Sequence, residues 1–152
     1  MPPEVSWKPE VERKFLVGFE KGERFEPERV FWVEQTYFVF PNAPETRLRK
    51  KIEKRPDGSF DVRFFETRKT GTGLVREESE TERRYEEFVS LFLEYSDACL
   101  EKHSVSKKRL LSGRWEIDVF GEDLVVAEIE LSSADETFPP LPRGIGLVRE
   151  VT

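Results

Sequence analysis

Charged and apolar residues alternate along one short segment after another, and this two-residue period constrains the fold more than any other feature. The segment 115–119 is WEIDV and the segment 127–131 is AEIEL. Residues i and i+2 of a β-strand point to the same side of a sheet, so each segment places carboxylates on one face and apolar side chains on the other. The pattern predicts strands with one ionic face and one apolar face.

Turn residues separate these segments at hairpin spacing. Pro56-Asp57-Gly58 and Gly71-Thr72-Gly73 each indicate a tight loop between two strands. We expect eight strands, at 12–17, 30–40, 46–54, 60–68, 74–80, 105–111, 114–120 and 124–131. Helical spacing of Tyr85, Phe88, Val89 and Phe92 predicts one helix within 82–98. No repeat or linker divides the chain, so residues 1–152 are expected to form one mainly β domain, an antiparallel sheet or barrel.

The charges that share a face are grouped by sign. Carboxylates dominate the first strand and the last two, and cations dominate the strands between. The same-face sets are Glu10, Glu12 and Lys14; Arg47, Arg49 and Lys51; Arg76, Glu78 and Glu80; Lys107 and Arg109; Glu116 and Asp118; and Glu128 and Glu130.

Two interpretations fit these charged faces. In the first, an ordinary sheet turns its polar face to water. In the second, the sheet closes with the charges inward. The apolar face is then covered by the helix and by the aromatic segment around Phe31, Trp32 and Phe38. Unpaired buried charges are costly, so such a lumen requires ligands of both signs. A triphosphate with its Mg²⁺ or Mn²⁺ is a ligand of this kind, because cations bind phosphate oxygens and carboxylates bind the metal.

Composition limits the partners and the compartment. The net charge of -6 disfavours nucleic acid and anionic membranes as partners. Cys99 is the only cysteine, which excludes an intramolecular disulfide and favours a reducing cytoplasm. Segment 1–9 lacks the apolar run of a signal peptide, and no segment is apolar enough to span a bilayer. These features predict a soluble cytoplasmic protein.

Nine blocks of sequence, in order, resemble the CYTH domain of the triphosphate tunnel metalloenzymes. The first is the ExExK motif, Glu10-Val11-Glu12-Arg13-Lys14. The others are Gln35-Thr36-Tyr37, Arg47-Leu48-Arg49, Thr67-Arg68-Lys69, Arg76 with Glu78 and Glu80, Lys107-Lys108-Arg109, 115–120, 127–131 and Glu150-Val151-Thr152. ExExK alone is a weak signal in so charged a chain, and the ordered series gives the resemblance its weight.

The resemblance implies an eight-stranded closed antiparallel β-barrel, with a charged lumen and helices packed outside. It implies metal-site carboxylates at Glu10, Glu12, Glu128 and Glu130, with Glu116 and Asp118 in the same acidic region. It implies phosphate-binding cations at Lys14, Arg47, Arg49, Lys69, Arg76, Lys107 and Arg109. Tyr37 matches a tyrosine proposed to assist the chemistry, so the catalytic set is Glu10, Glu12, Lys14 and Tyr37. Glu78 and Glu80 are expected to orient neighbouring cations.

The activity implied is divalent-metal-dependent hydrolysis of the terminal phosphate of a small-molecule triphosphate, with inorganic triphosphate as the first choice. The alternatives are a nucleoside or thiamine triphosphatase, an adenylyl cyclase, and a non-catalytic sensor of polyphosphate or nucleotide. The protein is expected to be a monomer or a homodimer. Members of the family usually continue past the last block into a short helix that can close one tunnel mouth. This sequence stops at Thr152, so either it is truncated or the natural protein ends there.

Overall fold

The computed structural model describes residues 6–152. The expectation for segment 1–9 therefore falls partly on residues 1–5, which lie outside the described residues. The elements, in chain order, are β1 (Lys8–Phe19), β2 (Arg29–Val39), β3 (Glu45–Lys54), β4 (Phe60–Thr70), β5 (Val75–Arg83), α1 (Tyr85–Ala98), β6 (Glu101–Ser112), β7 (Trp115–Phe120), β8 (Leu124–Leu131) and β9 (Ile145–Glu150).

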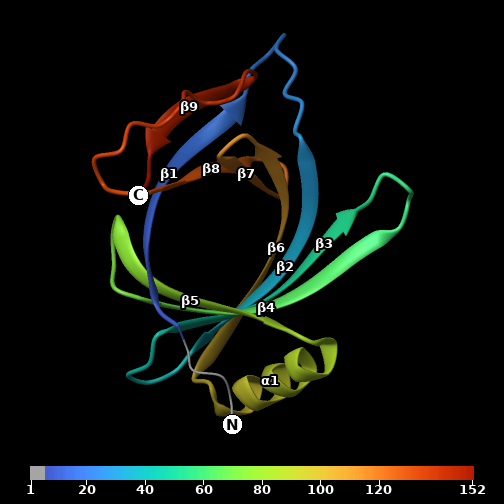
Figure 1. Cartoon of the computed structure of the whole chain (residues 1–152), viewed down its shortest axis with the longest axis vertical. Coiled ribbons are helices and arrows are strands. Elements are labelled where there is room, and N and C mark those ends of the chain that lie inside the picture. Colours follow the sequence, from blue (N-terminus) through green and yellow to red (C-terminus); the bar gives the residue numbers. More distant parts are fainter. Residues whose placement is uncertain (1–5) are drawn as a thin grey trace.

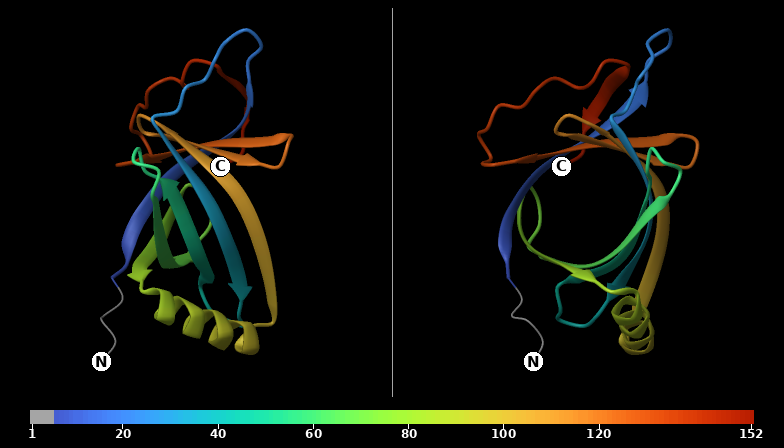
Figure 2. Two further views of the ribbon diagram at one scale, coloured as in Figure 1. Left: turned by 90° about the vertical axis from the view of Figure 1, so that its right-hand side faces the viewer. Right: turned by 45° about the vertical axis from the view of Figure 1, so that its right-hand side comes forward.

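Eight of the strands form a closed antiparallel barrel. They are hydrogen-bonded in the order β5-β4-β3-β2-β6-β7-β8-β1, and pairing of β1 with β5 closes the ring. The strands enclose a ring in Figure 1 and in the right-hand view of Figure 2. This arrangement confirms the predicted mainly β fold and the closed eight-stranded barrel.

A ninth strand, which the sequence pattern did not predict, extends the sheet beside β1. The first part of β1 pairs with β5, as far as Val11 opposite Val75. Further along the same strand, β9 pairs with Phe15–Phe19. Figure 1 shows β9 lying along the far half of β1. The two ends of β1 thus have different neighbours, β5 at its start and β9 at its end.

The main apolar core lies outside the barrel wall, on the faces of β1, β7 and β8 that point away from the lumen. Val11, Phe15, Trp115, Ile117 and Ile129 are buried there. The connector before β9 covers this layer: Phe138 packs on Phe15 and Trp115, and the Trp115 indole donates to the Pro140 carbonyl at 2.9 Å. Val11 therefore points away from the lumen, opposite to the face that the alternation assigned to Glu10, Glu12 and Lys14.

A second, smaller apolar cluster lies under α1, the only helix in the described part of the chain. Phe38 of β2 packs edge-on against Phe92 and Tyr95 of the helix. The helix begins at Tyr85 rather than at Glu82, because β5 continues to Arg83. Within residues 6–152, no helix combines the length and the apolar character that crossing a membrane would require.

One detail of the expected outer layer was wrong. Adjacent strand residues point to opposite sides, so Phe31 and Trp32 cannot both face outward. Phe31 is buried on the lumen side, where the Lys51 ammonium lies 4.2 Å from its ring centroid. Trp32 faces outward and is 42% exposed. Of the three aromatic residues, only Phe38 is covered by the helix.

Two loops predicted from glycine have the expected conformation. Gly58 closes the β3–β4 hairpin with a φ of 89°, and Asp57 accepts a hydrogen bond from the Ser59 backbone. Gly71 and Gly73, with φ of 86° and 83°, turn the chain between β4 and β5. The second loop matters for the site, because it brings the Leu74 carbonyl within 3.2 Å of the Glu12 amide at the rim of the lumen.

Candidate active site

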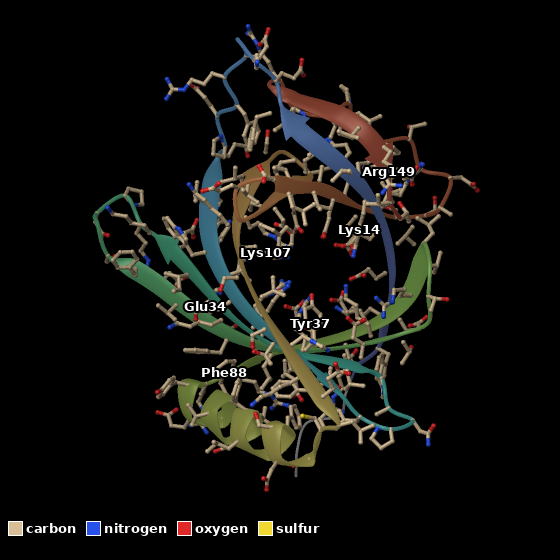
Figure 3. The ribbon with its side chains drawn as sticks, turned by 180° about the vertical axis from the view of Figure 1, so that it is seen from behind. Lys14, Glu34, Tyr37, Phe88, Lys107 and Arg149 are labelled. Carbon is tan, nitrogen blue, oxygen red and sulfur yellow. The ribbon has the colours of Figure 1, made fainter. Side chains whose placement is uncertain are left out.

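The lumen face carries the charged residues that the alternation placed together. Figure 3 shows Lys14, Tyr37 and Lys107 directed toward the interior from three strands, and Glu34, Phe88 and Arg149 on the outside. Register fixes the neighbours of the β3 cations: Arg47 lies opposite Tyr37 of β2, and Arg49 lies opposite Gln35. The lumen face is thus mainly ionic, with Phe31 among its side chains, and the two packed apolar clusters lie outside it.

The three cations on the lumen face of β3 have no carboxylate partner among residues 6–152. Arg49 is 7% exposed, and its Nε donates to Gln35 Oε1 at 3.0 Å. Arg47 donates from Nη2 to Thr67 at 3.3 Å, and its buried Nε has no hydrogen-bond partner. Lys51 lies over the Phe31 ring. Buried cations without counter-charges are costly, so this wall of the lumen is complementary to an anion.

Electrostatics agree with that geometry. Burial, with repulsion from Arg47 and Arg109, lowers the pKa of Arg49 to about 10. Burial and the Arg109 charge also lower the pKa of Lys51. An anion bound among these groups would restore their preference for the charged form.

Lys107 and Arg109 differ from the β3 cations because they share one carboxylate. Asp118, which is 0% exposed, accepts from Lys107 at 2.7 Å and from Arg109 at 2.8 and 2.9 Å. Burial lowers the pKa of Lys107 to about 8, assisted by the Arg109 charge and opposed by Asp118. Burial acts to raise the pKa of Asp118, but the bonds from Arg109 outweigh it and lower that pKa. Arg109 also lies 3.2 Å from Glu116 and 3.8 Å from Glu128, so these two cations, unlike those of β3, are balanced by carboxylates.

Asp118 therefore lies differently from the other carboxylates expected at a metal. Both of its oxygens already accept bonds from cations. This position suits a group that holds Lys107 and Arg109 in place. Glu116 lies nearer the rim, with Arg109 3.2 Å from its Oε2.

Carboxylates of β1 and β8 form the opposite, acidic wall. Register places Glu12 across from Glu130, and Lys14 across from Glu128. Burial and repulsion from Glu128 raise the pKa of Glu12 to about 7, and burial with the Glu10 charge raises the pKa of Glu130. Lys14, 3.4 Å from Glu12, offsets only part of this repulsion.

Glu10 has its own partners at the β1–β5 seam. Lys69 donates to its carboxylate at 2.9 Å, and Glu10 is 7% exposed. Burial and a hydrogen bond shared with Glu10 raise the pKa of Glu78 to about 8. Burial also acts to raise the pKa of Glu10, but the bonds from Glu78 and Lys69 outweigh it and lower that pKa. The structure thus engages the expected phosphate ligand Lys69 with a carboxylate.

Two pockets meet at Glu12. One, of about 320 Å³, is bordered by Glu10, Lys14, Arg76 and the loop 71–74. The other, of about 410 Å³, is bordered by Glu116 and Glu130. Arg76 bonds Glu45 at 2.7 Å, and its buried Nε has no partner. Space for a ligand therefore adjoins both acidic and basic side chains.

The acidic wall fits a divalent cation by its donor chemistry. Within residues 6–152, no three Asp, Glu, His or Cys side chains are already gathered into a metal-binding group. Mg²⁺ and Mn²⁺ prefer oxygen ligands, and Mg²⁺ commonly uses one or two carboxylates with water and substrate phosphate. Glu12, Glu128 and Glu130 offer such oxygens, and a cation there would relieve the repulsion that raises the pKa of Glu12.

Sequence reasoning left some lumen residues out of the candidate set. Lys51 shares the face of Arg47 and Arg49, and Gln35 precedes Tyr37 by two residues, so the two-residue period was a signal for both. The bond between Glu10 and Glu78 had no such signal, because it depends on how β1 meets β5.

In comparisons with known proteins, no family model, no curated protein and no solved structure matches this chain. The fold and the site define a closed antiparallel β-barrel whose lumen has one cationic wall and one acidic wall.

Proposed function

We propose that this protein is a divalent-metal-dependent triphosphatase that releases the terminal phosphate of inorganic triphosphate. The observation that carries the proposal is the trio of lumen cations without carboxylate partners, Arg47, Arg49 and Lys51, in the same barrel as the mutually repelling Glu12 and Glu128. A ligand that is both polyanionic and metal-bound neutralises both walls at once.

The cations would bind the phosphate chain. Arg47 and Arg49 have guanidinium groups suited to gripping two phosphate oxygens each. Lys107 and Arg109, held by Asp118, would contribute fixed positive charge from the neighbouring strand. Charge that spreads over the phosphate oxygens in the transition state is stabilised by such preorganised donors.

Glu12, Glu128 and Glu130 would hold the metal, with Glu10 and Glu116 beside them. When bound, Mg²⁺ or Mn²⁺ would neutralise phosphate charge and polarise the phosphorus centre. Glu12, which borders both pockets, would also orient a water and accept its proton. The water oxygen forms a bond to the terminal phosphorus, the P–O bond to the next phosphate breaks, and diphosphate leaves. Lys14 and Tyr37 face the same space and would contact the reacting phosphates.

The ordered blocks that resemble the triphosphate tunnel metalloenzymes support the same proposal. The eight-stranded barrel is the architecture that this resemblance implied, although fold alone does not fix function. The proposal includes a cytoplasmic location, favoured by the single Cys99, and a small-molecule partner rather than nucleic acid. It leaves the monomer and the homodimer as alternatives.

A phosphate-release panel tests the proposal. The purified protein is incubated with inorganic triphosphate, ATP, GTP or thiamine triphosphate, each with Mg²⁺, with Mn²⁺ or with EDTA. We expect metal-dependent release that is fastest with inorganic triphosphate and is abolished in Glu130→Gln. Release from a nucleotide or thiamine triphosphate alone would reassign the substrate. Tight binding without release under any metal would favour the sensor. Full activity in EDTA would remove the metal mechanism.

A further inference from the structure

A short chain of hydrogen bonds links three lumen side chains on β2 and β3. Arg49 Nε donates to Gln35 Oε1 at 3.0 Å, and Gln35 Nε2 donates to the Tyr37 hydroxyl at 2.9 Å. Gln35 is 4% exposed. Its two strand neighbours, Glu34 and Thr36, point to the other side of the wall, and Figure 3 shows Glu34 outside the barrel.

The chemistry of the donors fixes the direction of this chain. A guanidinium can only donate, so the Gln35 atom facing Arg49 must be the carbonyl oxygen. The amide nitrogen then faces Tyr37, and it too can only donate. The Tyr37 hydroxyl must therefore accept, which leaves its own proton unused by Gln35. Among residues 6–152, the Tyr37 hydroxyl makes no other side-chain hydrogen bond.

We infer that Gln35 is a positioning residue: it orients the Tyr37 hydroxyl so that this hydroxyl donates a hydrogen bond to phosphate in the lumen. The same side chain holds the Arg49 guanidinium beside Tyr37. The inference rests on the proposed function, and it adds to it a reason for the orientation of Tyr37. Arg49 keeps its remaining donors for phosphate, and Tyr37 adds a neutral one from the same network. A donor fixed in this way stabilises negative charge that grows on a phosphate oxygen without having to reorient.

The test replaces the Gln35 amide, which donates to Tyr37, with a group that can only accept. In Gln35→Glu both side-chain oxygens accept, so Arg49 keeps a partner but the Tyr37 proton turns toward the new carboxylate. We expect kcat for inorganic triphosphate to fall about tenfold in Gln35→Glu and in Tyr37→Phe alike, because each loses one hydrogen bond to developing charge. The new negative charge also weakens binding, so KM rises.

A double-mutant cycle separates these two effects. In the Tyr37→Phe background, Gln35→Glu should leave kcat unchanged while its effect on KM persists. An equal loss of kcat in both backgrounds would overturn the inference, as would a normal kcat for Tyr37→Phe. The matched control is Glu34→Gln, an exchange of acid and amide at the adjacent, outward-facing position, which should change neither constant. If Gln35→Glu does not fold, Gln35→Met, which cannot donate to Tyr37, enters the same cycle.

A spectroscopic readout keeps the inference distinct from the proposed function. The tyrosine doublet in the Raman spectrum, taken as the difference between each protein and its Tyr37→Phe counterpart, reports whether the Tyr37 hydroxyl is a strong donor. We expect the strong-donor signature in Gln35→Glu and its absence in the ligand-free wild type. Its presence in the wild type would overturn the orientation. A protein that shows the expected spectra but hydrolyses no triphosphate would refute the proposed function while the orientation stands.

Discussion

Asp118 shows that carboxylates on the same lumen face can have different roles. The two-residue period places Asp118 on the same face as Glu116, which makes both appear to be metal ligands. The structure pairs Asp118 with Lys107 and Arg109 at full burial. A carboxylate in this position is expected to serve stability first and ligand binding second.

Replacing Asp118 by asparagine tests this assignment. Asp118→Asn would leave the buried Lys107 without a carboxylate and would remove the closest one from Arg109, so we expect a loss of about 3–5 kcal/mol in the free energy of unfolding. Chemical denaturation of the metal-free protein measures it, and Asp123→Asn in the exposed β7–β8 turn is the matched control. Unchanged stability together with lost metal activation would instead make Asp118 a metal ligand.

At the level of single elements, β1 is the strand whose two faces differ most clearly in what they contact. Val11 belongs to the outer apolar core, and Glu12 faces the lumen between two pockets. Changes at these adjacent residues should therefore have opposite consequences.

Val11→Asp should destabilise the protein by about 3 kcal/mol or more, because it buries a charge with no partner. Glu12→Gln should not lower the melting temperature, because it removes a lumen charge with a raised pKa, and it should abolish phosphate release. Thermal melts and release assays on both variants measure this. A Glu12→Gln protein with full activity, or a Val11→Asp protein with wild-type stability, would contradict the assignment of faces.

The sequence predicted the faces of the strands well and their partners less well. The alternation around Val11 and Glu12 is a local property, so the faces of this strand could be predicted from the sequence. The ion pairs Glu10–Lys69 and Lys107–Asp118 depend on register and on closure of the ring, which no local period contains. β9 was missed because six residues after a proline-rich connector form a strand only against the far half of β1.

For the whole molecule, burial of carboxylates in the lumen and the repulsion between them make stability depend on pH. Burial and neighbouring carboxylates raise the pKa of Glu12 to about 7 and that of Glu78 to about 8, from a usual value of 4.5. The folded chain therefore binds more protons than the unfolded chain between these values, so stability falls as pH rises through this range.

This linkage predicts a melting temperature of the ligand-free protein that decreases from about pH 5.5 to about pH 7.5. The lowered pKa of Glu10 and of Asp118 places their titration below this interval. Glu78→Gln should flatten the slope and raise the melting temperature at the upper end. A melting temperature that rises throughout the interval, or a slope that Glu78→Gln leaves unaltered, would contradict this account of the lumen.

In the proposed function, the lumen-facing cations of β3 bind a triphosphate inside the barrel. Calorimetric titration of inorganic triphosphate with Mg²⁺ into wild type and Arg49→Ala tests it most directly, and Arg24→Ala at an exposed position serves as the control. We predict one bound molecule per barrel and, since a hydrogen bond to a charged group contributes about 1.5–3 kcal/mol, binding at least about tenfold weaker in Arg49→Ala alone. No binding by the wild type, or equal affinity in all three proteins, would contradict the claim.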